Sequence, residues 1–330
     1  MIRNYLIIAL RNISRHPGYT AINIIGLAVG MACCALIALY ITDELSVDAF
    51  HEKGDRIYRI VRERQLAGGT ANFSMGSSGE AGPLLQKDFP EVEMAVRYVG
   101  WGGWTKHEEK AFNAGWSVVD NNFLDVFDFE LISGDRETAL DEHSAALITE
   151  SEAKRFFGND DPIGKVVEVD DRYMGGSYKI TGVLKDPTRA STLRFGFLTA
   201  THDNTSWMNG VFTGWATNTS FVPVSTILLL REGTDPKLLE EKLPGWLRRY
   251  VSEDDARPIT YHLMLFKDSY LYARQNFDIG WYSDITYVYL FGTVGVFILL
   301  IACINFMNLA TARSAGRARE VGLRKTVGAY

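Results

Sequence analysis

The residues that could do chemistry are plentiful in this chain, but they do not form the groupings that catalysis requires. Paired carboxylates at 160–161, 170–171 and 254–255 stand in turn-like sequences, where we expect them to be solvated. Residues 76–79 read Gly-Ser-Ser-Gly, which is not the Gly-x-Ser-x-Gly spacing of a nucleophile elbow. Six histidines are scattered, with no pair at metal-ligand spacing and no cysteine nearby: His16, His51, His107, His143, His202 and His262. The sequence therefore predicts no enzyme, metal site or cofactor.

A turn from Gly158 to Gly164 resembles a phosphate-binding loop at first sight. Five residues separate the two glycines where that motif requires four, and Lys165 is not followed by the Ser or Thr that would hold Mg²⁺. Two acids inside the turn would also repel phosphate. We interpret it as a turn from a helix to a strand, so the chain has no nucleotide-binding loop of its own.

The elements that would position any site are dominated by two long apolar stretches. Residues 19–41 and 287–312 contain no Lys, Arg, Asp or Glu. Each reaches the roughly 20 residues that a helix needs to cross a ~30 Å hydrocarbon layer. We therefore predict transmembrane helices at 18–42 and 285–312. The first is too long for the apolar region of a cleaved signal peptide.

Small and polar residues inside these stretches indicate where helices would pack in a membrane. Gly26 and Gly30 have the Gly-x-x-x-Gly spacing that allows a second helix to approach closely. Asn305 and Asn308 are polar at membrane depth, where side chains usually face protein or water. We predict that these four residues mediate transmembrane helix packing.

The distribution of charge predicts the orientation. Residues 1–18 carry three arginines and no acid, and residues 313–330 carry five cations and one acid. The whole chain nevertheless has a formal net charge of −6, so its middle is strongly acidic. Because cations accumulate on the cytoplasmic side, both termini should be cytoplasmic and the middle segment outside. The acidic middle also excludes nucleic acid as a partner.

The remaining segments are predicted from periodicity. Residues 1–17 form a basic amphipathic helix, which we expect to lie on the cytoplasmic membrane surface; the alternative is an extension of the first span. The mixture of strand and helix patterns in residues 43–284 predicts a large α+β domain in two lobes, outside the membrane. Residues 71–82 and 202–219 are rich in Gly, Ser and Asn and predict mobile loops. Strands are predicted at 57–63, 95–101, 145–149, 165–169, 178–184, 195–199, 225–230 and 259–266.

Three helices are predicted in the same domain, at 82–89, 150–157 and 236–250. Thr149 and Glu152 have capping-box spacing at the start of the second. Asp235 followed by proline marks the start of the third. The tryptophans at 101, 104 and 116 are interpreted as packing in the core of this domain or at its membrane-proximal rim, with a ligand-facing aromatic surface as the alternative.

The most specific pattern lies where the second apolar stretch ends. Asn305 and Asn308-Leu309 are followed at residues 317–329 by the sequence RAREVGLRKTVGA. This resembles the N-x-x-N-L span end and the R-x-R-E-[IV]-G-[IL]-R-K-x-x-G-A segment of the MacB/FtsX-type ABC transporter permeases, the type VII or mechanotransmission class. Residues 4–30 and 48–59 are similar to the family's opening helix, first span and domain start. Residues 123–127 and 156–165 resemble its MacB-like periplasmic core domain.

The resemblance implies a non-catalytic permease, multi-pass in a bacterial inner membrane and surrounded by lipid. It implies a separate cytoplasmic ABC ATPase that binds ATP and Mg²⁺, a second permease copy or homologous half, and a periplasmic adaptor or substrate protein as a further partner. Members have at least four spans, so we expect this chain to be a piece of a longer permease. Residues 313–330 would be the coupling segment, contacting the ATPase through Arg313, Arg317, Arg319, Glu320, Gly322, Arg324, Lys325 and Gly328.

Three alternatives stay open. In the first, the cations of residues 313–330 do not couple to an ATPase and only satisfy the positive-inside bias. In the second, the chain is a two-span sensor kinase or chemoreceptor with a periplasmic ligand-binding domain, which would usually continue with heptads after the second span. In the third, it is a membrane-tethered adhesion or scaffold protein. The sequence does not select a substrate, nor export over activation of a periplasmic partner.

Overall fold

The computed structural model describes residues 17–66, 69–142, 144–171, 175–200, 224–273, 282–326 and 328. The chain divides into two compact units, one of Met1–Leu45 with Ile285–Tyr330 and the other of Ser46–Asp284. Each unit is described by itself. Most of the predicted surface helix at 1–17 and the predicted loop at 202–219 lie outside the described residues.

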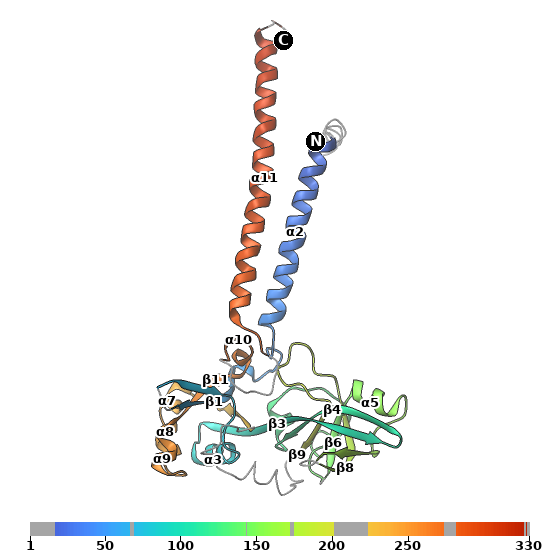
Figure 1. Ribbon diagram of the computed structural model, residues 1–330, viewed down its shortest axis with the longest axis vertical. Helices are drawn as coiled ribbons and strands as arrows, with labels where there is room; N and C mark the ends of the chain where they lie inside the picture. The colour runs from blue at the N-terminus through green and yellow to red at the C-terminus, as the bar shows by residue number, and fades with distance from the viewer. Residues whose placement is uncertain are drawn as a thin grey trace. The chain divides into compact units, whose positions relative to one another are not determined.

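The first unit is a pair of long helices (Figure 1). Helix α2 spans Pro17–Leu45 and begins at a proline, whose fixed φ and missing N–H suit the first helical position. Helix α11 spans Ile285–Thr326 and runs antiparallel to α2. Within the described residues, Thr20–Leu45 and Ile285–Asn308 are long and apolar enough to cross a membrane.

The second unit is built on a mixed β-sheet. Two of its strand pairs, β4 with β9 and β6 with β8, are parallel, and the others are antiparallel. The main path runs in the order β11-β1-β10-β3-β4-β9-β6-β8-β5, with β2 paired to β1 and β7 paired to both β3 and β8. The described strands are β1 (Ile57–Gln65), β2 (Ala71–Ser74), β3 (Val92–His107), β4 (Lys110–Val119), β5 (Leu131–Gly134), β6 (Ala145–Thr149), β7 (Val166–Asp170), β8 (Gly176–Leu184), β9 (Phe197–Ala200), β10 (Ser225–Leu230) and β11 (Ile259–Leu265).

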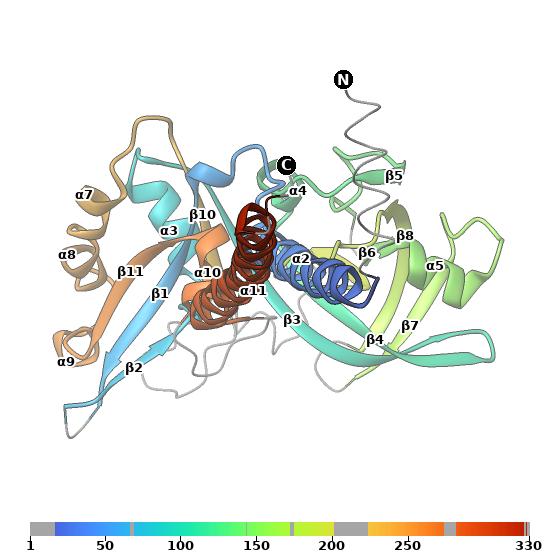
Figure 2. The same cartoon turned by 90° about the horizontal axis from the view of Figure 1, so that it is seen from above.

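Short helices cover the two ends of this sheet. Figure 2 shows α3, α7, α8 and α9 beside β1, β10 and β11, while α5 lies beside β6, β7 and β8. Strand β3 runs across both groups. The described helical segments are η1 (Gly54–Arg56), α3 (Ala81–Asp88), α4 (Phe123–Val126), α5 (Glu150–Phe157), α7 (Pro236–Glu240), α8 (Leu243–Leu247), α9 (Glu253–Ala256), η2 (Phe266–Asp268) and α10 (Ser269–Tyr272).

The core follows the same division. One cluster packs Ile60 and Leu85 around Trp246 under α3 and α8. A second packs Phe156 against Trp116 under α5, and a central cluster around phenylalanines such as Phe123 lies between them. The predicted α+β composition is confirmed. The two expected lobes are present only as separate core clusters, because one continuous sheet connects them among the described residues.

Each of the eight predicted strands overlaps an observed strand, but β2, β4 and β5 were not predicted. The prediction of a mobile loop at 71–82 is wrong. Its first residues form β2, and the turn that follows is buried, with Ser77 completely inaccessible. The Ser77 hydroxyl lies 2.5 Å from the Thr226 hydroxyl, and its N–H donates to the Val224 carbonyl. Serine is therefore accommodated there because its polar groups are satisfied.

Two helix predictions need correction. The helix expected at 236–250 is divided into α7 and α8, since Pro244 has no N–H to continue the helical hydrogen bonding. Asp235 caps α7 as expected, by accepting the Lys237 N–H at 2.9 Å. Helix α5 has its predicted bounds, but the Thr149 side chain makes no capping hydrogen bond. The Asp186 carboxylate caps it by accepting the Ser151 N–H at 3.0 Å.

Candidate functional site

The face of α2 that contacts α11 carries small residues. A Cβ added at Gly30 would stand 3.0 Å from the Cβ of Ala302, and one added at Gly26 would stand 3.2 Å from Nδ2 of Asn305. Further along, the Cys34 thiol donates to the Gly295 carbonyl at 3.4 Å. Glycine therefore sets how closely the two backbones approach.

The predicted packing residues are thus only partly brought together. Gly26, Gly30 and Asn305 lie at the contact between the helices, whereas Asn308 is on an exposed side of α11. Their role inside a membrane stays a prediction.

The predicted coupling segment continues α11 without a break. The helix passes through residues 313–326, so most of the basic segment is the end of a 42-residue helix. Gly328 follows with a positive φ of 73°, which is typical of the residue just after a helix. The side chains of Arg313, Arg317, Arg319, Glu320, Arg324 and Lys325 lie outside the described part of the structure. The assignment of these residues to ATPase coupling stays a prediction.

The segment that follows α2 is fixed to the second unit by Asp48. Its carboxylate accepts the Thr192 N–H at 3.0 Å and the Thr192 hydroxyl at 2.6 Å, while its own N–H donates to the Ala190 carbonyl at 2.7 Å. Burial raises the pKa of Asp48, and the hydrogen bonds from Thr192 act in the opposite direction. The backbone φ of 56° at Asp48 places this residue in the left-handed region, which Asp tolerates.

His51 forms the second attachment of this segment. Its Nδ1 accepts the Asp128 N–H at 3.1 Å, so the proton of the neutral ring is on Nε2. Burial among aromatic rings lowers the pKa of His51 to about 4, although the Asp128 carboxylate raises it. His51 is therefore neutral at physiological pH. Both residues come from the stretch that resembles the start of the family's outer domain, and the sequence alone did not indicate what they contact.

Two arginines extend these attachments into the sheet. Arg59 is 3% exposed and donates to the Ser225 hydroxyl at 2.7 Å and to the Tyr282 hydroxyl at 2.8 Å. Arg97 pairs with Asp120, with Nη2 to Oδ1 at 2.6 Å. These contacts hold neighbouring segments of the second unit together.

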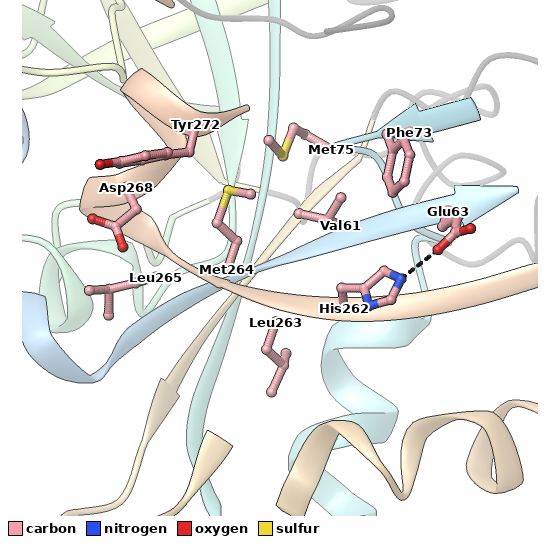
Figure 3. A pocket seen from close by; sticks show the side chains of 10 residues that line it. All are labelled: Val61, Glu63, Phe73, Met75, His262, Leu263, Met264, Leu265, Asp268 and Tyr272. Atoms are coloured by element: carbon pink, nitrogen blue, oxygen red, sulfur yellow. Dashed lines mark hydrogen bonds and ion pairs between the residues drawn. The ribbon is translucent and has the colours of Figure 1, made fainter. Parts of the chain in front are cut away.

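A pocket of about 610 Å³ lies on the face of β1 and β11 that carries Val61 and Met264 (Figure 3). Its size is in the range of small-molecule sites. Phe73 and Met75, at and just after β2, line one side, and Tyr272 of α10 lines another. The sequence did not predict this pocket, because its strands are almost 200 residues apart in the chain.

One end of the pocket carries a hydrogen-bonded triad. His262 is 2.8 Å from Glu63 through Nε2 and 3.0 Å from Glu240 through Nδ1. Burial lowers the pKa of His262, but the hydrogen bonds and charges of the two glutamates outweigh it and raise the pKa. Glu240 also accepts the Leu263 N–H at 2.7 Å, which satisfies part of the edge of β11.

The tryptophans separate into two environments. Trp116 is 1% exposed and stacks on Phe197, with ring centroids 4.4 Å apart, which agrees with the packing interpretation. The ring of Trp101 is stacked on the ring of Trp116, with ring centroids 6.1 Å apart. Trp104 is 57% exposed on β3, so it does not pack in the core. A place for it at a membrane-proximal rim stays a prediction.

The loop that resembled a phosphate site is a helix-to-strand turn, as predicted. It connects α5 to β7, with positive φ at both Gly158 and Gly164, and Lys165 pairs with Asp160 at 3.0 Å. The lysine is thus paired within the turn. In the described part of the chain, no group of three or more His, Cys, Asp or Glu residues could hold a metal ion.

Comparison with known proteins agrees with this fold. The MacB-like periplasmic core domain family matches residues 20–245, and the chain therefore belongs to that family. A domain assigned to a permease protein of Porphyromonas gingivalis has a similar fold, with 24% identity and a TM-score of 0.55, covering 66% of this chain and 93% of that one. No curated protein matches the chain.

Two further solved structures align more loosely. The periplasmic region of MacB from Actinobacillus actinomycetemcomitans is 15% identical with a TM-score of 0.44, covering 66% of this chain and 91% of that one. The extracellular domain of the ABC-type transporter YknZ from Gram-positive bacteria is 15% identical with a TM-score of 0.42, covering 62% and 99%.

Proposed function

We propose that this chain is the permease part of an ABC transporter of the MacB type and transmits ATP-driven motion to a periplasmic domain. The family match over residues 20–245 supports the transporter class. The motion would serve export of a substrate or activation of a periplasmic partner. The chain itself would be non-catalytic, with ATP and Mg²⁺ bound by a separate cytoplasmic ATPase.

The observation that carries this proposal is the continuity of α11. Its apolar part, Ile285–Asn308, is long enough to cross a bilayer, and the helix continues to Thr326. At about 1.5 Å per residue the helix is roughly 63 Å long, about twice the ~30 Å hydrocarbon thickness. The basic segment would therefore project from the membrane on the same helix that crosses it, so a push at one end would be carried along the whole helix.

The proposed topology follows from the charge distribution. Helix α2 and the apolar part of α11 would cross a bacterial inner membrane, as two spans of a multi-pass protein, with domain bounds at 18–42 and 285–312. Residues 43–284 would be periplasmic, and both ends would face the cytoplasm because the cations lie there. A second permease copy or homologous half would complete the assembly in the lipid.

The coupling assignment is tested by two substitutions in the basic segment. We expect Glu320→Lys and Gly322→Asp to leave membrane insertion intact and to lower permease-stimulated ATP hydrolysis by the co-purified ATPase. Glu232→Lys, on the exposed turn after β10, is the matched control and should leave stimulation unchanged. Unchanged stimulation in both coupling variants would contradict the assignment.

A further inference from the structure

We propose that the pocket over β1, β2 and β11 binds a small organic cation that has an apolar body. This inference concerns the second unit alone and does not depend on the proposed coupling to an ATPase.

The middle of the pocket is suited to an apolar body. Val61, Met75 and Met264 form it, and Figure 3 shows the two methionine side chains close to the centre of the site. Methionine is flexible and polarisable, so it adapts to apolar groups of different shape. A volume of about 610 Å³ accommodates a drug-sized molecule.

The polar groups of the pocket favour a positive charge. Asp268 is only partly exposed, and no hydrogen bond or ion pair to its carboxylate exists within the described residues. Its negative charge acts on its surroundings: after burial, it is the next cause that raises the pKa of Tyr58. A carboxylate that is partly exposed and has no partner among the described residues is available to pair with a bound cation.

The opposite end of the pocket is also negative. Glu63 accepts from His262 and, at 2.6 Å, from the Gln65 amide, but each carboxylate oxygen has a second lone pair. The triad of Glu63, His262 and Glu240 carries a charge of −1 when the histidine is protonated and −2 when it is neutral. Two nearby cations, Arg59 and Lys267, do not line the pocket. Arg59 is directed to Ser225 and Tyr282, and Lys267 pairs with Asp55 at 2.5 Å.

Asp268 and Glu63, at opposite ends of the pocket, each have an aromatic ring at their own end. Figure 3 shows Phe73 toward the end of Glu63 and Tyr272 toward the end of Asp268. Tyr272 is 48% exposed, so its ring is accessible. A carboxylate together with an aromatic ring is the combination that recognises ammonium groups, through charge and cation–π attraction. The same carboxylates would repel an anion.

The test is photo-labelling of the full chain in lipid nanodiscs. The probe is benzyltrimethylammonium with a trifluoromethyl-diazirine on its ring, and the matched control is the uncharged neopentyl isostere. Peptide mass spectrometry locates the label, which separates binding in the pocket from partitioning into lipid. We expect the cation to label peptides of β1, β2 and residues 259–273 about fivefold more than the isostere does.

Asp268→Asn should reduce that preference to near unity, and Glu63→Gln should reduce it partly while keeping a hydrogen-bond acceptor for His262. Asp254→Asn, an exposed carboxylate on α9, is the matched control and should have no effect. Tryptophan fluorescence melting confirms that each variant is folded. Equal labelling by the two probes, absence of label in these peptides, or an Asp268→Asn variant that behaves like Asp254→Asn would overturn the proposal.

Discussion

At the scale of single residues, the two described histidines whose pKa values are shifted have opposite effects on how stability depends on pH. His51 is buried and neutral, with its pKa lowered to about 4, whereas His262 is held between two glutamates that raise its pKa. Stability from His262 is fully present below the unfolded pKa of about 6.5 and is lost as pH rises through its folded value. Stability from His51 is lost as pH falls, because the histidine has the higher pKa in the unfolded state and is protonated there first.

We therefore predict an acid-sensitive loss of stability that depends on His51. Between pH 6.5 and pH 4 the free energy of unfolding should fall by about 3 kcal/mol through this group, at about 1.36 kcal/mol per pKa unit. His51→Gln keeps an acceptor for the Asp128 N–H but does not titrate, so its stability should be flatter with pH. Chemical unfolding followed by tryptophan fluorescence measures the difference. Parallel pH profiles for the two proteins would show that His51 does not titrate in this range.

Asp48 should contribute through the hydrogen bonds that it accepts. Asp48→Ala leaves the buried Thr192 N–H and hydroxyl without an acceptor, which should lower the free energy of unfolding by roughly 2–3 kcal/mol. Glu109→Ala, an exposed acid in the turn between β3 and β4, is the comparison and should change it by less than about 0.5 kcal/mol. Equal melting of the two variants would mean that the attachment of residues 46–52 does not stabilise the domain.

At the scale of elements, the chain could be predicted well where one physical rule dominates. The buried strands β6 and β10 have their predicted bounds, because their apolar runs begin and end sharply. Helix α5 also has its predicted bounds, since Gly158 ends it, although the Thr149 side chain does not cap it. Strand β4 was not predicted, since its exposed residues include Ala111, Asn113 and Gly115, which are depleted in strands. The long hairpin with β3 specifies it instead. The pocket could not be predicted for a similar reason: no local pattern relates β1 to β11.

The contact between α2 and α11 is predicted to depend on Gly30. A larger side chain there meets Ala302, so Gly30→Leu should push the helices apart. The Cys34 thiol contacts the Gly295 carbonyl, so a Gly295→Cys thiol lies within reach of Cys34 for a short bifunctional thiol crosslinker. We expect Gly30→Leu to slow this crosslinking about fivefold or more, because close backbone approach holds such helices together.

Val29→Leu is the matched control, since Val29 is 57% exposed and lies beside the contact in sequence. It should not change the crosslinking rate. The same rate in the Gly30→Leu protein would indicate that the small-residue contact does not set the distance between the helices.

At the scale of the whole molecule, the proposed topology makes a prediction about chemical labelling. The three native cysteines lie in α2 and α11, within the segments predicted to be in lipid. A membrane-impermeant maleimide applied to spheroplasts should label Ser177→Cys, at an exposed position of β8, without further treatment. It should label Ser314→Cys, in the basic segment, only after permeabilisation. The reverse pattern would place the acidic domain in the cytoplasm and contradict the topology.

The central claim is that this chain works with a separate ABC ATPase, and affinity purification of the full-length gene product from solubilised membranes tests it most directly. Mass spectrometry would identify the co-purifying proteins, and an ATPase assay would measure their activity with and without vanadate. We predict an ABC ATPase subunit with vanadate-sensitive hydrolysis. Recovery of a histidine kinase or a chemotaxis adaptor, with no ATPase subunit, would contradict the permease assignment and make the periplasmic domain a sensor.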